Sequence, residues 1–230
     1  MRLLSVLLLL SAFSLAQKPP IVTITNACCA SLSRIDFNIQ GTTGVFSLPY
    51  GVTSTTINAT AGSASLHAAA GGDLNFTSGQ FTLAQDKAYT IVFYGNLDNP
   101  KVVGPIENLI DGDPKKIRIR FGLASTFIQQ NRPPNSQVRL RVLCPSFGNA
   151  SVVDIIGTDG AFSPAPPTYS ENGTRVFHET CKLQLVQVVS AATTVLLEQS
   201  YPLGTANNYT VLVVGSNSTN LAFVLFNDNK

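Results

Sequence analysis

Short segments in which apolar and polar residues alternate occur along the whole chain. The clearest are residues 22–25, 35–39, 117–120, 138–141 and 183–185. Successive side chains of a β-strand point to opposite faces, so each segment predicts a strand with one face on a core and the other in water. Turn residues such as GGD (71–73) and TDG (158–160) separate these segments. No stretch keeps a helical period, and the pattern predicts an all-β protein.

The two halves of the chain end on the same motif. LAQDKAYTIVFYG (residues 83–95) and LGTANNYTVLVVG (residues 203–215) share a leucine, a Tyr-Thr pair and a glycine at an offset of 120 residues. Upstream we align Cys28 with Cys144, and GVFS with GAFS, at an offset of 116 residues. We expect the recurring Tyr89 and Tyr209 to be core or sandwich-corner residues.

These matching blocks predict two tandem domains, over residues 18–112 and 113–230. About seven strands in a hundred residues is typical of a sandwich, so we expect two Ig-like or transthyretin-like antiparallel β-sandwich domains. The segment from residue 117 to residue 135 has no counterpart at the offset of 116. It is the last strand of the first domain, an extra edge strand of the second domain, or a clasp between the two.

Residues 1–16 have the parts of a secretory signal peptide: Arg2, an apolar stretch over residues 3–10 and a small-x-small cleavage site at Ser14-Leu15-Ala16. A membrane anchor would need about 20 apolar residues. We therefore expect the signal to be removed before Gln17 and the protein to be secreted, at the cell surface or in the matrix, with no membrane insertion.

Composition adds to this picture. Charged residues make up only 12% of the chain and the net charge is +2, which disfavours a nucleic-acid partner. Glycans would compensate for the few surface charges, and Asn-x-Ser/Thr sequons are their acceptor sites. The predicted N-glycosylation sites are Asn58, Asn75, Asn149, Asn172, Asn208 and Asn217.

The chain has four cysteines and two histidines, with no Cys-x-x-Cys pair, so the spacing does not predict a zinc site. Four cysteines allow three disulfide connectivities. We favour Cys144–Cys181, local to the second half. Cys28 and Cys29 are then left to form a bridge between neighbours, bond to another chain, or pair across to Cys144 and Cys181.

The order VTITNA, RIDFNI, GVFSLPYG, TINATAG and FTLAQDKAYTIVFYG in the first half resembles the secreted domain family of unknown function numbered 4397. The closing element of that family matches at Tyr89-Thr90 and Tyr209-Thr210, and its opening element matches residues 22–27 and 117–124. The middle of the second half departs from the family pattern. The resemblance implies an extracellular location and a sandwich fold, and it implies no reaction.

We find no catalytic constellation in the sequence. His67 and His178 are not at equivalent positions and have no nucleophile motif nearby. Asp111 and Asp113 are too few oxygen ligands for calcium, which takes six to eight. We expect no enzyme activity, no cofactor and no metal.

The arginines form the only charged pattern. Arg118 and Arg120 alternate on one predicted strand, and Arg139 and Arg141 on another. If these strands pair, four guanidinium groups share one sheet face and would bind an anionic partner. The alternative is a solvent-exposed face without a ligand, whose charges discourage edge-to-edge aggregation of the sheet.

Together these features favour a secreted glycoprotein with a structural or adhesive role, as a fibre, cell-wall or matrix subunit that self-associates or binds other extracellular proteins. The alternative is a soluble module that binds an acidic polysaccharide. A hydrolase with a site assembled only in space is a third and weaker hypothesis.

Overall fold

We describe the protein from a computed structural model, which defines residues 17–108, 117–145, 153–157, 170–172, 178–204 and 207–227, with only the backbone for 153–157 and 170–172. The predicted signal peptide and the predicted domain boundary at residues 112 and 113 lie outside the described residues, as do Asp111, Asp113 and Asn149. The protein is all-β, and its described residues contain one short helix, α1 (Thr126–Asn131).

The first half folds into two four-stranded sheets and a small ribbon. One sheet, here sheet A, has the order β10-β9-β1-β4, from β1 (Ile21–Cys28), β4 (Ile57–Asn58), β9 (Ala88–Asn96) and β10 (Asn99–Glu107). Sheet B has the order β3-β2-β6-β7, from β2 (Ile35–Ile39), β3 (Phe46–Leu48), β6 (Leu66–Ala70) and β7 (Leu74–Thr77). The ribbon pairs β5 (Gly62–Ala64) with β8 (Phe81–Leu83).

The second half repeats this plan. Sheet D has the order β14-β11-β17-β18, from β11 (Ile117–Ser125), β14 (Ser170–Asn172), β17 (Asn208–Gly215) and β18 (Ala222–Asn227). Sheet E has the order β13-β12-β15-β16, from β12 (Gln137–Leu143), β13 (Val153–Gly157), β15 (His178–Val189) and β16 (Ala192–Gly204). In each half the two sheets pack over one apolar core.

Each half contains one parallel strand pair, which the expectation of fully antiparallel sheets missed. β1 runs parallel to β9, with Cys28 opposite Gly95, and β11 runs parallel to β17, with Ser125 opposite Gly215. All other pairs are antiparallel.

These registers correct the upstream alignment at an offset of 116. Because Gly95 and Gly215 are equivalent, Cys28 is equivalent to Ser125 and not to Cys144. β11 is therefore the counterpart of β1, and β12 the counterpart of β2. The segment from residue 117 is the opening, central strand of the second half. None of the three placements considered for it gave this position, although the family resemblance matched its opening element to residues 117–124.

The recurring closing motif has a physical explanation at each position. The hydroxyls of Tyr89 and Tyr209 accept hydrogen bonds from the backbone N–H of the residue five positions upstream, each at 3.0 Å. This is the geometry of a tyrosine corner, and both rings are buried. Gly95 has a φ of +109°, and a Cβ there would lie 2.4 Å from the carbonyl oxygen of Asn99. Gly215 meets the same constraint against Asn220, so a residue that must be glycine lies at or next to the end of both strands.

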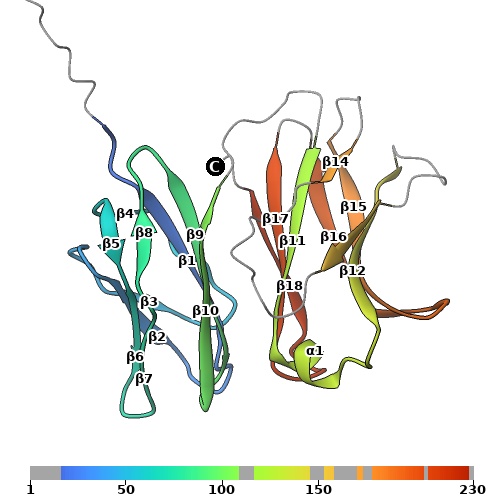
Figure 1. Ribbon diagram of the computed structural model, residues 1–230, viewed down its shortest axis with the longest axis horizontal. Coiled ribbons are helices and arrows are strands. Elements are labelled where there is room, and N and C mark those ends of the chain that lie inside the picture. Colours follow the sequence, from blue (N-terminus) through green and yellow to red (C-terminus); the bar gives the residue numbers. More distant parts are fainter. Residues whose placement is uncertain are drawn as a thin grey trace, which may run out of the picture.

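The four large sheets lie in a row, in the order B, A, D, E (Figure 1). The outer faces of sheets A and D pack on each other through a third apolar cluster, which we call the docking core. It contains Ala27, Val92, Tyr94, Val103 and Ile106 from the first half and Ala124, Leu212 and Val214 from the second.

This docking explains why the two closing strands do not alternate. Along β9, Ile91 and Phe93 face the core of the first half, whereas Val92 and Tyr94 face the docking core. Every residue of β17 is buried in the same two-sided way. A strand covered on both faces has no solvent side, so its sequence is a continuous apolar run, as in IVFY (91–94) and VLVV (211–214).

The structure contains two disulfides. Cys144 is joined to Cys181, which is the pairing that we favoured. Cys28 is joined to its neighbour Cys29, so the described chain has no free cysteine. Both bridges are buried.

Candidate functional site

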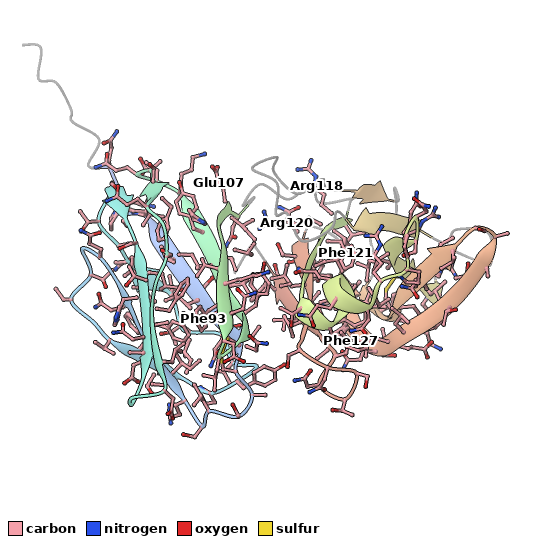
Figure 2. All side chains as sticks on the ribbon, turned by 60° about the horizontal axis from the view of Figure 1, so that its bottom comes forward. Phe93, Glu107, Arg118, Arg120, Phe121 and Phe127 are labelled. Carbon is pink, nitrogen blue, oxygen red and sulfur yellow. A yellow bond between two sulfur atoms is a disulfide. The ribbon has the colours of Figure 1, made fainter. Side chains whose placement is uncertain are left out.

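The most elaborate polar site of the described chain lies at the seam between sheets A and D. Arg120 projects from β11 into the space between the two halves, toward the end of β10 where Glu107 lies (Figure 2). Its neighbours Ile119 and Phe121 point the other way, into the core of the second half. The alternation predicted for this strand is therefore correct, but the polar face meets the first half of the protein instead of water.

Arg120 is 1% exposed and its guanidinium contacts both halves. Nε donates to the Thr210 hydroxyl on β17, and one terminal nitrogen donates to the backbone carbonyl of Glu107 at 2.7 Å. The other terminal nitrogen donates to the side-chain oxygen of Asn108 at 3.2 Å. A buried charge is tolerated only when its donors are satisfied, and the rigid fork of arginine suits such a set of acceptors.

A chain of hydrogen bonds extends this site into sheet A. The Thr90 hydroxyl donates to Asn108 at 2.9 Å and lies 3.3 Å from the Thr23 hydroxyl on β1. Thr90 and Thr210 are the threonines of the repeated closing motif, so both copies place a hydroxyl at the seam. At the exposed rim, Lys87 and Glu107 form an ion pair at 2.6 Å.

Two tyrosines lie at the seam further along. Tyr94 of β9 is buried in the docking core, and the Tyr50 hydroxyl donates to the carbonyl of Asn220 at 3.4 Å. Burial raises the pKa of both phenols above the ordinary value. The seam thus combines an apolar centre, which includes Tyr94, with hydrogen bonds from Arg120 and Tyr50 that join the two halves.

The expected face of four arginines does not exist. β11 belongs to sheet D and β12 to sheet E, so the strands do not pair, because β12 lies between β13 and β15. Arg120 is buried at the seam, and Arg118 lies on the same strand. Arg139 and Arg141 do share the outer face of sheet E, where the Arg139 guanidinium donates to Gln137.

The neighbouring charges on that outer face are paired. Lys182 and Glu198 form an ion pair at 2.8 Å, and Gln184 donates to the same carboxylate. Hydrogen bonds from Lys182 and Gln184 hold the pKa of Glu198 below its ordinary value.

The sequons occupy different environments. Asn58 on β4, Asn75 on β7 and Asn217 in the loop before β18 are exposed, and Asn172 lies on β14. Asn208, at the start of β17, is fully buried, so a glycan cannot reach its side chain in the folded protein. We therefore expect Asn208 to stay unmodified. The sequon alone did not show this, because local sequence does not report what covers a strand.

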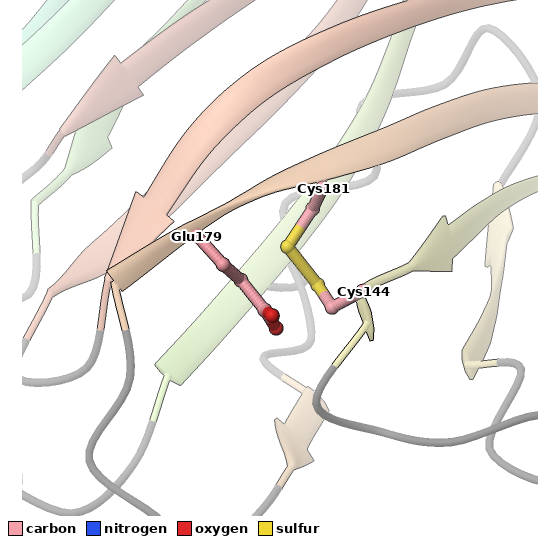
Figure 3. Close-up of side chains that lie close together, drawn as sticks. All are labelled: Cys144, Glu179 and Cys181. Carbon is pink, nitrogen blue, oxygen red and sulfur yellow. A yellow bond between two sulfur atoms is a disulfide. The ribbon is translucent and has the colours of Figure 1, made fainter.

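The only grouping of potential metal ligands among the described residues is Cys144, Glu179 and Cys181 (Figure 3). The two sulfurs are bonded to each other, so neither is available as a thiolate ligand. The histidines are far apart in the fold: His67 contacts Asn75 at 3.0 Å in sheet B, and His178 contacts the carbonyl of Leu203 at 3.3 Å in sheet E.

Among the described residues, no helix has the length and apolar character needed to cross a membrane. No protein-family model matches the sequence, and no curated protein matches it. One similar solved structure is a leucine-rich repeat protein from Bacteroides thetaiotaomicron, 12% identical, with a TM-score of 0.22. The match covers 85% of this chain and 26% of that protein, and a likeness this weak carries no argument about fold or function.

Proposed function

We propose that this protein is a secreted structural or adhesive subunit of an extracellular fibre, wall or matrix, in which the two halves act as one stiff body. The observation that carries the proposal is the seam between sheets A and D, with its apolar docking core and the buried Arg120. Interfaces between domains of one chain are commonly polar and mobile. A seam that buries apolar side chains and a guanidinium with all three nitrogens hydrogen-bonded resists bending.

Three further features support this role. The two disulfides suit an oxidising compartment, and the predicted signal peptide would deliver the chain there. The exposed sequons would carry solubilising glycans on a surface with few charges. The resemblance to the family numbered 4397 also implies an extracellular location, and it stays a prediction.

The test uses the full chain secreted from a eukaryotic host. We expect a glycosylated protein in the medium. Either its native mass, measured by light scattering, rises with protein concentration, or the protein is retained on insoluble matrix and cell-wall fractions. A monomer at every concentration that passes through those fractions would overturn the proposal.

Binding to an acidic polysaccharide is the second hypothesis, and it now rests on fewer residues. Only Arg139 and Arg141 share an outer face, and nearby Lys182 is already paired with Glu198. Exchange of both arginines for serine should abolish retention on an acidic polysaccharide column if this hypothesis holds. Unchanged elution of the variant would end it.

A further inference from the structure

β16 is the longest strand in the described chain and forms the outer edge of sheet E. It pairs with β15 on one side, and no described strand pairs with its other side. An open edge presents backbone N–H and C=O groups that can bind another extended chain. The twelve and thirteen residues of β15 and β16 form the curved hairpin at the far end of the row of sheets (Figure 1).

The first part of β16 has the composition of a pairing strand. Residues 192–197 read ATTVLL, with no charge, no proline and no glycine, and with three β-branched side chains. Val195 is 48% exposed, and Val189 at the hairpin turn is 37% exposed. Natural proteins avoid exposed, uncharged edges of this kind because they promote association.

Other edges of the protein carry features that oppose pairing. Three sequon asparagines lie on edge strands, namely Asn58 on β4, Asn75 on β7 and Asn172 on β14. The edge strand β10 contains two prolines, a lysine and a bulge. Even the second part of β16 has Glu198 and Pro202. Residues 192–197 have no charge, proline or sequon, although Leu196 forms a bulge against β15. The edge strand β18 is uncharged as well, but its side chains pack on the second core and the docking core, whereas residues 192–195 are exposed.

We propose that residues 192–197 form an antiparallel strand pair with the same segment of a second copy, so that sheet E continues across two chains. A two-fold axis makes residues 192–197 of one chain run antiparallel to the same residues of the other chain. Threonine, valine and leucine side chains then lie opposite one another, and no like charges meet. An uncharged edge is best matched by another uncharged edge, and this chain supplies one in every copy. This inference deepens the proposed structural role and rests on it.

The test compares two exposed valines in the full secreted chain. Val195→Lys places a charge on the edge, and Val45→Lys places the same charge on a loop of the first half where valine is 66% exposed. We expect Val195→Lys to raise the dimer dissociation constant, measured by analytical ultracentrifugation, by about tenfold or more. Val45→Lys should leave it unchanged. A monomeric parent protein, or equal dimerisation of all three proteins, would overturn the inference.

A cysteine variant gives an independent readout. In the two-fold pair, Thr194 of one chain lies opposite Val195 of the other, so a mixture of Thr194→Cys and Val195→Cys chains should form a disulfide-linked dimer under mild oxidation, whereas a mixture of Thr194→Cys and Val45→Cys chains should not. A mixture of Thr194→Cys and Val195→Cys chains that stays monomeric on a non-reducing gel would contradict the pairing. Retention on matrix fractions tests the proposed function independently of the β16 contact. A chain that does not dimerise but is still retained overturns only the β16 contact.

Discussion

Replacement of Arg120 tests whether the seam makes the two halves one cooperative body. Arg120→Met keeps much of the apolar stem of the side chain but removes all donors. The carbonyl of Glu107, the amide oxygen of Asn108 and the hydroxyl of Thr210 then lose this donor inside a buried interface, and Asn108 keeps the hydrogen bond from Thr90. Thr210→Val is the matched, smaller change, because it is nearly isosteric and removes a single acceptor.

The magnitude follows from the contacts. Hydrogen bonds to a charged donor are each worth roughly 1.5–3 kcal/mol, and each buried acceptor left without a donor costs roughly 1–3 kcal/mol. We expect Arg120→Met to lower the free energy of unfolding by about 3–5 kcal/mol. Thr210→Val leaves the guanidinium with its Glu107 and Asn108 contacts, so we expect a loss of about 1–2 kcal/mol.

The assay is denaturant unfolding followed by circular dichroism and tyrosine fluorescence, which is a usable signal because the chain has no tryptophan. We expect the parent protein to unfold in one transition. Arg120→Met should unfold in two, because each half retains its own core while the seam is weakened. A single transition with a free energy within about 0.5 kcal/mol of the parent value would refute the reasoning.

Three further predictions concern ionisation, glycosylation and the long-range disulfide. Burial raises the pKa of Tyr94, so as the pH rises the unfolded chain loses the phenol proton before the folded chain does. The contribution of Tyr94 to stability is therefore complete below pH 10.0 and falls as the pH rises above that value, which denaturant midpoints across this range measure. Peptide mapping by mass spectrometry should find a glycan on Asn217 and unmodified asparagine at Asn208, which is buried. Exchange of Cys144 and Cys181 for alanine opens a link across 37 residues and should cost roughly 4 kcal/mol of unfolding free energy.

Each of these has a clear contrary result. Midpoints that do not change through alkaline pH would show that the tyrosine at the seam ionises as it does in water. A glycan on Asn208 would place that strand end in solvent. A cysteine-free second half with parent stability would mean that the bridge adds nothing to the sandwich.

Much of the local structure could be predicted from the sequence. Alternation shows which side of a strand faces a core, and it correctly separates Leu140 from Arg139 and Arg141 on β12. The closing motif predicted the corner tyrosines Tyr89 and Tyr209, because a corner needs that residue at that spacing in both halves. The composition of short strands and turns also predicted the all-β class.

The tertiary structure decided which strands are neighbours and what covers their outer faces. Alternation is the same whether the polar face of a strand meets water or another sheet, so it could not show that Arg120 is buried while Arg139 is only half-buried. The parallel pairing of β1 with β9, and of β11 with β17, joins residues far apart in sequence. An alignment of short sequence blocks does not contain this register, so it aligned Cys28 with Cys144 instead of Ser125. The uninterrupted apolar runs of β9 and β17 were the signal for burial on both faces. Only the packing of sheet A on sheet D determined what those second faces contact.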